Sequence, residues 1–497
     1  MTDWTDFSDA LDLGPLVPAA FARYRQAVID GMMVFLDRLP EEQTAAILFD
    51  QAMLGEDAGI GQRLVAIARH CPALHKLAQV LARDRRLPAD LRRHLQTLET
   101  LPASHDTPWL RGEIEREIGP LAALDVTLGA APLAEASVAI VVPFLWHQGG
   151  RARPRRGVFK LLKPGIEAVL ERELVVLQEI GGVLDARCQD YGLPSIAYED
   201  SFAQVRDLLR GEVHLDLEQR HMVEARAVYE GLDTVQVPEV FAFSTPRLTA
   251  MERIDGGKIT DVADLPGSRR RRLAADIVAA LIARPIWSEA DASLFHADPH
   301  AGNLMLTPTG RIGLLDWSLV GRLDKHERVC LTQILIGALT IDPERIAAGI
   351  ADLGRPEGGI ETLRAIVEAS LGPVRAGTWP GLAWLTDLMD ATATRASVRY
   401  GANLIVFRKV LQTLQGVVAD VCEEAGTDAA MAEAFVGHLA REWPARLVAR
   451  PFRRDFATHM SNAELTHLLA SAPLMAARMW SGWAARTAGL GPVALSD

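Results

Sequence analysis

The spacing of apolar residues changes twice along this 497-residue chain, and these changes constrain its fold more than any other feature. Up to about residue 115, apolar residues recur three and four positions apart, which predicts helices separated near prolines. From about 132, the runs ASVAIVVPFLWH and RGVFKLL flank a Gly/Arg/Pro turn and predict a β-hairpin. Helical spacing returns from about 325 to 485. We therefore expect an α+β fold.

The middle of the chain contains further strand signals. A helical stretch over 166–230 precedes VQVPEVFAF and RLTAMERI, which predict two more strands, and a helix is expected over 266–290. LMLTPTGRIGLLDW predicts a strand pair around the turn Pro308-Thr309-Gly310. The expected division is a helical extension over 1–115, a small α/β part over 116–257, a larger part over 258–425 and a helical extension over 426–497.

Charge and cysteine content disfavour several functions. Lysine plus arginine number 52 against 64 acidic residues, and the net charge of −12 disfavours nucleic acid as a partner. Four cysteines lie far apart, without the paired spacing of zinc sites or disulfide frameworks, which favours a reducing cytoplasm. The N-terminus is acidic, unlike an export signal, and the longest uncharged stretch, 136–150, is too short to cross a membrane. We expect a cytoplasmic protein with no transmembrane helix.

The most informative stretch is FHADPHAGNLMLTPTGRIGLLDWSLVG, residues 295–321. Asp298 precedes Asn303 by five residues, and Asp316 follows Asn303 by thirteen, at the end of an apolar strand. In a phosphoryl-transfer site one Asp orients the acceptor, while an Asn and a second Asp hold the Mg²⁺ that bridges the nucleotide phosphates. Each of these residues alone could instead cap a turn, but the joint spacing favours phosphoryl transfer.

This stretch resembles the UbiB (AarF-like) family of atypical protein-kinase-like proteins, whose catalytic loop is close to HADPHPGN and precedes an LDFG-type metal motif. The resemblance implies a bilobal protein-kinase-like fold, with a small mixed α/β lobe, a mainly helical large lobe and an N-terminal helical extension folded back over the cleft. Matching blocks extend over about 70 to 425: LHKLAQ for the KxGQ helix, PLAEASVAIV for the Ala-rich nucleotide loop, GVFKLLKPG for the lysine strand, GEVHLDLEQRH for the ExD region, VPEVF and MERIDG for the hinge strand, and VFRKVLQTLQGV.

The resemblance also implies roles for single residues. Asp298 would orient the acceptor, Asn303 and Asp316 would hold Mg²⁺, and Lys160 would contact the phosphates of ATP or ADP. Because Lys160 lies among apolar neighbours it needs an anionic partner, for which Glu218 is the better candidate and Glu212 the nearby alternative. Both glutamates could equally lie on a solvated face. The other implied nucleotide contacts are Ala134, Ala136, Ser137, Val138, Glu252, Ile254, Lys76 and Gln79, of which the last two could instead be surface residues.

Several positions depart from the family pattern and mark a divergent member. Glu135 introduces a carboxylate near the expected phosphates, which is unfavourable unless a metal or an arginine intervenes. Ala78 adds a methyl group to the KxGQ-like helix, and His214 replaces the Asp of ExD. The remaining departures are Ile140, Ala301 and the pair Trp317-Ser318.

Two basic clusters and the C-terminal tail are candidates for membrane contact. Arg151/Arg153/Arg155/Arg156 and Arg269 to Arg272 could bind anionic lipid headgroups, although a solvated basic face is the commoner explanation. The tail LLASAPLMAARMWSGWAA carries a stripe that could lie on an interface, although core packing is favoured. Its members are Met475, Met479, Trp480 and Trp483.

The leading hypothesis is a Mg²⁺-dependent ATP-binding atypical kinase or ATPase. By resemblance it supports isoprenoid quinone (ubiquinone) or related lipid biosynthesis, with enzymes of such a pathway as partners and a peripheral position at the inner membrane. Two alternatives stay open: a pseudokinase scaffold that binds nucleotide without turnover, and a small-molecule phosphotransferase of the aminoglycoside/choline kinase type.

Overall fold

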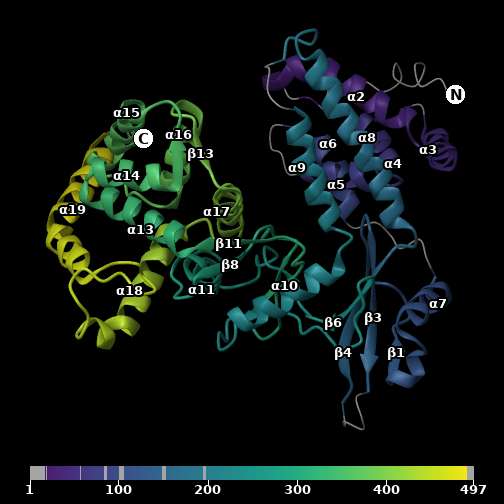
Figure 1. The fold of residues 1–497 in the computed structure, drawn as a ribbon. Helices are drawn as coiled ribbons and strands as arrows, with labels where there is room; N and C mark the ends of the chain where they lie inside the picture. Colours follow the sequence, from purple (N-terminus) through teal and green to yellow (C-terminus); the bar gives the residue numbers. More distant parts are fainter. Residues whose placement is uncertain are drawn as a thin grey trace, which may run out of the picture. The chain divides into compact units, whose positions relative to one another are not determined.

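The computed structural model describes residues 17, 19–55, 57–82, 87–99, 106–147, 153–193 and 198–489. The chain divides into two compact units, one made of residues 1–223 and 238–253 and the other of residues 224–237 and 254–497. Figure 1 shows the elements of each unit. The predicted four-part division at residues 115, 257 and 425 stays a prediction.

Helices make up one part of the first unit. They are α2 (Arg25–Asp37), α3 (Glu41–Met53), α4 (Ile60–Ala68), α5 (Pro72–Leu81), α6 (Ala89–Gln96), α8 (Ile166–Arg187) and α9 (Tyr198–Gly211), with short 3₁₀ turns at Ala19–Tyr24 and Thr97–Glu99. Pro40 and Pro88 precede α3 and α6, and Pro72 begins α5, positions where the missing N–H costs nothing. Phe35, Ile67 and Leu174 bring these helices together in one apolar core.

An antiparallel sheet forms the other part of the first unit. Its order is β1 (Val126–Leu128), β3 (Ala139–Trp146), β4 (Arg155–Leu162), β6 (Leu248–Glu252), and β2 (Ala134–Glu135) pairs with β3. The predicted hairpin is confirmed, because β3 and β4 pair over their full length. Helix α7 (Thr107–Ile118) and the 3₁₀ turn Leu121–Leu124 add Leu110, Ile114 and Leu121 to the sheet's core of Ile140, Phe144 and Phe159.

One strand prediction is wrong in part. Within VQVPEVFAF only β5 (Val235–Gln236) forms a strand, and it belongs to the second unit, where it runs parallel to β10 (Ile312–Leu314). A single bridge, Val240 to Met251, links the rest of that segment to β6. Pro238 lacks the N–H that a sheet ladder needs, which accounts for the interruption.

The described residues of the second unit form three small sheets. The predicted pair of β9 (Leu304–Leu306) and β10 is confirmed, and with β5 and β7 (Gly257–Lys258) it forms a four-stranded sheet. The sequence patterns did not predict the antiparallel pair β8 (Ala292–His296) with β11 (Val320–Asp324), or the pair β12 (Gly354–Pro356) with β13 (Val398–Tyr400). The predicted helix over 266–290 is α11 (Gly267–Val278), which continues through a π turn (Ala279–Ala283) into α12 (Arg284–Ile286).

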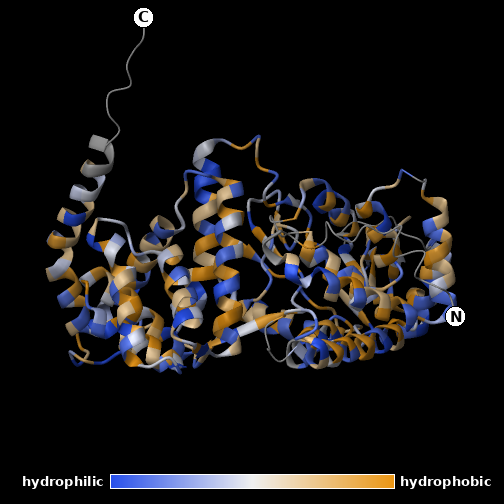
Figure 2. Ribbon diagram, turned by 90° about the horizontal axis from the view of Figure 1, so that it is seen from above, coloured by the Kyte–Doolittle hydropathy of each residue, from blue (hydrophilic) through white to orange (hydrophobic). Residues whose placement is uncertain are grey.

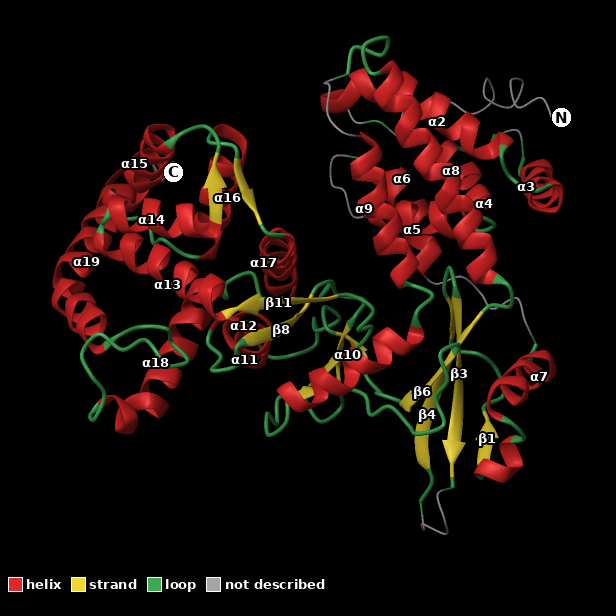
Figure 3. Ribbon diagram, in the orientation of Figure 1, coloured by secondary structure: helices red, strands yellow, loops and turns green. Residues whose placement is uncertain are grey.

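The remaining chain is helical, as Figure 3 shows in red. Helix α10 (Leu215–Val228) passes from the first unit to the second, and α13 to α19 follow β11. Asp324 begins α13 with a capping box completed by Glu327, and Asp342 caps α14. Their bounds are α13 (Lys325–Thr340), α14 (Pro343–Leu353), α15 (Ile360–Arg375), α16 (Leu382–Arg395), α17 (Ala402–Val421), α18 (Thr427–Arg446) and α19 (Asn462–Gly489).

The C-terminal helix α19 corrects one expectation. Met479, Trp480 and Trp483 are exposed, so core packing of these three side chains is wrong, and Met475 is only half-buried. Figure 2 shows orange and blue residues mixed along the helices. Periodicity predicts an apolar stripe, but only tertiary packing decides whether another helix covers it. Among the described residues, no helix combines the length and the apolar character needed to cross a membrane.

Candidate functional site

In the first unit, Lys160 pairs with Glu218, as expected from the sequence. Lys160 lies on β4 opposite Val141 and Thr249, and its Nζ donates to the two carboxylate oxygens of Glu218 at 2.9 and 2.8 Å. Glu218, in the first turn of α10, is only 2% exposed. Two charges removed from water in this way are stable only together, so the pair holds the lysine in one orientation.

A second lysine–glutamate pair ties the KxGQ-like helix to the segment between α9 and α10. Lys76 Nζ on α5 lies 2.8 Å from Glu212 Oε1. Gln79, one turn further along, donates instead to the carbonyl of Leu98 at 3.3 Å, and the buried His75 bonds the same carbonyl at 2.9 Å. Of the two expected nucleotide contacts on this helix, Lys76 therefore pairs with the segment after α9. Gln79 instead bonds the backbone of the short 3₁₀ turn Thr97–Glu99.

A third lysine–glutamate pair involves the unexpected carboxylate of the Ala-rich loop. Glu135 is 6% exposed, and its Oε1 lies 2.8 Å from Lys163 Nζ, just beyond the end of β4. The expectation that a metal or an arginine must offset Glu135 is therefore wrong, because a lysine does so. Sequence reasoning missed Lys163, although its position three residues after Lys160 in FKLLKPG was a usable signal.

The Ala-rich loop itself is a tight turn between β2 and β3. The N–H of Ala136 donates to the carbonyl of Ala139 at 2.8 Å, and Ser137 is buried between them. Val138 accepts from the N–H of Lys163 at 2.9 Å and packs against Leu215 at the start of α10. Ala134 lies on β2, opposite Val141. The loop is thus packed against the helix that carries Glu218.

The expected hinge residues lie where the chain leaves the first unit. Glu252 ends β6 opposite Gly157, and its carboxylate accepts from the N–H of Glu239 at 3.2 Å. Ile254 begins the following segment of the second unit, where it is buried against Gly313 of β10. A Cβ atom at Gly313 would lie 2.8 Å from Ile254 Cγ2, so any larger residue there would have to displace the Ile254 side chain.

In the second unit, backbone and side-chain bonds bring Asp298, Asn303 and Asp316 together. Asn303 Nδ2 donates to the carbonyl of Asp298 at 3.0 Å, and the carbonyl of Asn303 accepts from the N–H of Leu315 at 2.9 Å. The hairpin of β9 and β10 therefore places Asn303 beside the residue that precedes Asp316. Because the amide nitrogen of Asn303 is engaged, its oxygen is the atom that can ligate a metal.

His296 links the two acidic loops, a role that sequence reasoning did not assign. Its Nδ1 accepts from the N–H of Asp298 at 3.2 Å, so Nε2 carries the proton and donates to the carbonyl of Leu315 at 2.9 Å. Burial lowers the pKa of His296, which keeps the ring neutral. Its place at the end of a strand, two residues before Asp298, was the available signal.

Trp317 and Ser318 fix the conformation of Asp316. The indole of Trp317 is fully buried, donates to the carbonyl of Leu314 at 3.2 Å and packs against His296 with ring centroids 4.7 Å apart. The N–H of Ser318 donates to Asp316 Oδ1 at 3.3 Å. Asp316 has a φ of 55°, a left-handed conformation that a non-glycine residue keeps only when its surroundings impose it.

The oxygen donors fit Mg²⁺. The described residues contain no group of three or more His, Cys, Asp or Glu side chains that could form a complete metal cage. Mg²⁺ does not need one, because it is bound by one or two carboxylates together with phosphate oxygens and water. The Asn303 amide oxygen and the Asp316 carboxylate are hard donors of this type.

Comparison with known proteins finds one matching domain family and a set of relatives that share a name. Residues 123–349 match the ABC1 atypical kinase-like domain. The chain is 26% identical over 373 residues to the "Probable protein kinase UbiB" of Xanthomonas oryzae pv. oryzae (strain MAFF 311018) and 25% identical over 375 residues to that of Aliivibrio fischeri (strain MJ11). Residues 123–349 of this chain are therefore similar to the ABC1 atypical kinase-like domain, and the longer match is to proteins named UbiB. The matches cover 72% of this chain and 66% of each relative.

A solved structure is also similar to this chain. It is titled "The complex structure of Rv3197-erythromycin from Mycobacterium tuberculosis", with 18% identity, a TM-score of 0.48, and coverage of 77% of this chain and 95% of that one. The match of residues 123–349 to the ABC1 atypical kinase-like domain, in a chain of two compact units, confirms the bilobal α+β kinase-like fold that the sequence predicted.

The ABC1 match includes most of the candidate site. Lys160, Glu218, Asp298, Asn303 and Asp316 all lie within residues 123–349. Lys76 and Gln79 precede the match, and α18 and α19 follow it. The parts of the chain outside the match therefore need arguments from their own contacts.

Proposed function

We propose that this protein is a Mg²⁺-dependent atypical kinase or ATPase of the UbiB type that binds ATP and ADP. The observation that supports this most strongly is the hydrogen-bonded arrangement of Asp298, Asn303 and Asp316, held by His296. An acceptor-orienting Asp with an Asn and a second Asp as metal ligands is the residue set that phosphoryl transfer requires.

Each residue has one role in the proposal. Asp316 and the amide oxygen of Asn303 hold Mg²⁺, which when bound neutralises charge on the phosphates. Lys160 contacts the phosphates, and Glu218 keeps its ammonium in place. Asp298 orients the attacking hydroxyl or water.

The Ala-rich loop and α5 complete the nucleotide contacts in this proposal. Ala136, Ser137 and Val138 form the turn that contacts the phosphates in this proposal, with Ala134 beside it on β2, in place of the glycine-rich loop of ordinary kinases. Lys163 offsets Glu135, so this loop adds no net negative charge near the phosphates. Lys76 and Gln79 act from α5, and Glu252 and Ile254 act from the hinge segment.

The proposed setting is isoprenoid quinone (ubiquinone) or related lipid biosynthesis. The support is the ABC1 match together with the UbiB name of the relatives. In this proposal the protein works in the cytoplasm, peripherally at the inner membrane, with enzymes of such a pathway as partners.

The test is thermal unfolding of the full chain with ATP, ADP or AMP, with and without Mg²⁺. A ligand at 100 times its dissociation constant stabilises the folded state by about 2.7 kcal/mol, which gives a shift of several degrees. We expect a Mg²⁺-dependent shift with ATP that Asp316→Asn abolishes. Asp420→Asn, an exposed site on α17 with the same loss of charge, is the matched control and should keep the shift.

Two other results would overturn parts of the proposal. No shift with any nucleotide would contradict nucleotide binding and leave a scaffold as the better account. A shift accompanied by stoichiometric phosphorylation of a soluble alcohol or amino sugar would assign the chain to small-molecule phosphotransfer.

A further inference from the structure

The connection between α18 and α19 exposes an unusual concentration of apolar side chains. We call residues 441–455 the α18–α19 corner. Leu447, Val448 and Phe452 are 71%, 88% and 83% exposed, and Trp443 is 53% exposed. Single exposed apolar residues are ordinary, but four large ones within ten residues mark an interaction surface.

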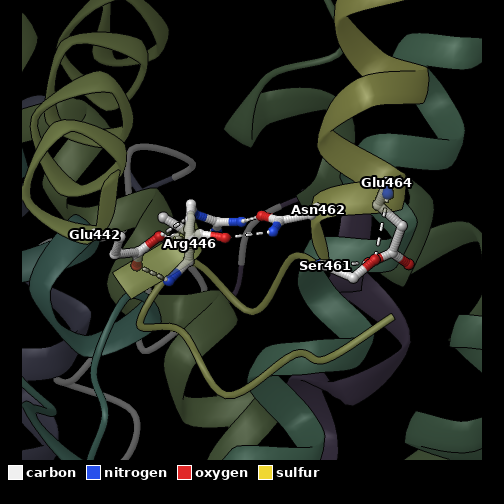
Figure 4. Close-up of polar contacts among 6 residues, drawn as sticks. Glu442, Arg446, Ser461, Asn462 and Glu464 are labelled. Atoms are coloured by element: carbon white, nitrogen blue, oxygen red, sulfur yellow. Dashed lines mark hydrogen bonds and ion pairs between the residues drawn. The ribbon is translucent and has the colours of Figure 1, made fainter. Parts of the chain in front are cut away.

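A buried ion-pair network fixes the chain beneath this surface (Figure 4). Arg446 and Glu442 have side chains only 2% and 6% exposed, and Arg446 Nε and Nη2 donate to Glu442 Oε2 at 3.0 and 2.8 Å. Arg446 Nη1 also donates to Asn462 Oδ1 at 3.1 Å, and Asn462 Nδ2 returns a bond to the carbonyl of Arg446 at 2.7 Å. The end of α18 and the start of α19 are therefore tied to each other directly.

The same network holds the segment that leads into α19. The N–H of Thr458 donates to Glu442 Oε1 at 2.8 Å, and Arg446 Nη2 donates to the hydroxyl of Thr458 at 2.6 Å. A second bond set, from Ser461 and Arg454 to Glu464, closes the turn. Because both sides of the corner are tied down, its apolar side chains are presented without the entropy cost of ordering a loop on binding.

The charge of the corner opposes that of the whole chain. Residues 441–455 contain five arginines and two carboxylates, a charge of +3 in a chain whose net charge is −12. Arg441 and Arg450 are exposed, and within the described part of the chain neither forms an ion pair with a carboxylate. By contrast, Arg155 and Arg272, from the two basic clusters noted in the sequence, contact Glu239 and Asp276.

We propose that the α18–α19 corner docks on a bilayer surface that contains anionic lipids. Leu447, Val448 and Phe452 enter the boundary of the acyl chains, while Arg441 and Arg450 contact the headgroups. Side chains that are 71–88% exposed project singly from a turn, which suits insertion among lipids better than a flat contact with another protein. The exposed indole of Trp443 suits the polar–apolar boundary. This inference does not depend on the proposed nucleotide chemistry.

The experiment is co-sedimentation of the full chain with vesicles. One set contains phosphatidylcholine alone, and the other contains phosphatidylcholine with phosphatidylglycerol as about one third of the lipid. Wild type should bind the anionic vesicles, and Leu447→Ser/Phe452→Ser should weaken that binding at least tenfold. Arg441→Gln/Arg450→Gln should weaken binding about 30-fold, which corresponds to about 1 kcal/mol for each arginine near an anionic surface. Added salt should weaken wild-type binding.

The matched control removes apolar side chains of similar exposure elsewhere. Phe49 and Met53 on α3 are 66% and 72% exposed, so Phe49→Ser/Met53→Ser should bind vesicles as wild type does. All variants alter exposed side chains, and unchanged melting temperatures and nucleotide-induced shifts would show that the fold is intact.

Three outcomes would overturn the inference. The first is that wild type does not sediment with anionic vesicles, and the second is that the corner variants bind as tightly as wild type. The third is that wild type self-associates without lipid and the Leu447→Ser/Phe452→Ser variant does not. That third result would make the corner an interface with a second copy or another protein.

Discussion

The start of α5 is held by a carboxylate from another helix, and this contact predicts a pH-dependent stability. Glu173 on α8 is 2% exposed, and its Oε2 accepts from the N–H of Ala73 in the first turn of α5 at 2.8 Å. Its Oε1 accepts from Gln43 Nε2 at 2.8 Å, beside the buried thiol of Cys71. Burial outweighs these bonds and the nearby charge of Arg172, and raises the pKa of Glu173 from 4.5 to about 7.

Whether stability rises or falls with pH depends on which state of the chain, folded or unfolded, binds the proton of Glu173 more tightly. A carboxyl group whose pKa is higher in the folded chain than in the unfolded chain favours folding at low pH. Its contribution is fully present below pH 4.5 and is lost as the pH rises through about 7. A change from 4.5 to about 7, at 1.36 kcal/mol for each pKa unit, amounts to about 3 kcal/mol.

The substitution Glu173→Gln removes the titration and keeps the shape. Gln keeps one acceptor oxygen and loses the other, so the free energy of unfolding of the variant is lower by about 1 to 2 kcal/mol at every pH. Urea unfolding is measured at about pH 5 and about pH 8. Between these pH values the free energy of unfolding of the first unit should fall by about 3 kcal/mol more in wild type than in Glu173→Gln. Glu179→Gln is the matched control, because Glu179 lies on the same helix with its side chain 44% exposed beside Arg38.

Amide hydrogen exchange gives a second measurement. In wild type, α5 amides should lose protection as the pH rises, after correction for intrinsic exchange, and in Glu173→Gln they should not. Equal losses of stability in wild type and Glu173→Gln would refute the reasoning, because Glu173 would then not titrate in this interval.

Three further predictions concern the candidate site. Lys160→Met should lower the free energy of unfolding in urea by about 3 kcal/mol, because Glu218 stays buried without its partner. Lys160→Met/Glu218→Leu should recover most of this loss, and no recovery would contradict the burial of the two residues as a pair. His296→Phe keeps the packing on Trp317 but removes both hydrogen bonds. It should therefore lower the free energy of unfolding by about 2 kcal/mol and weaken Mg²⁺–nucleotide binding in calorimetry. Unchanged binding would show that His296 does not position the site. Ala78→Gly on the buried face of α5 should lower stability by about 1 kcal/mol and change the ratio of ADP to ATP affinity, and an unchanged ratio would count against α5 acting on nucleotide.

Sequence patterns predicted the elements that form between residues close together in the chain. The apolar runs around the turn before residue 155 were sufficient for the β3–β4 hairpin. The kinase-like fold was expected from the resemblance of HADPHAGN and the other motif blocks to the UbiB family, and the ABC1 match bears this out. The roles of Asp298, Asn303 and Asp316 in binding and catalysis stay predictions. The pair β8–β11 was missed because the loop that carries Asp298 and the β9–β10 hairpin lie between its two strands, so no local turn indicates the pairing.

The sequence by itself determined the helices, the hairpins and the identity of the charged residues, because these depend on neighbours along the chain. Only the tertiary structure decided which carboxylate each lysine meets. Lys160 has Glu218 58 residues away, and Lys163 has Glu135 on another strand. Several carboxylates would attract a given lysine about equally in water, and the choice among them is made when packing removes one from solvent beside it. Packing likewise decided that the tryptophans of α19 are exposed, because an apolar stripe does not specify what covers it.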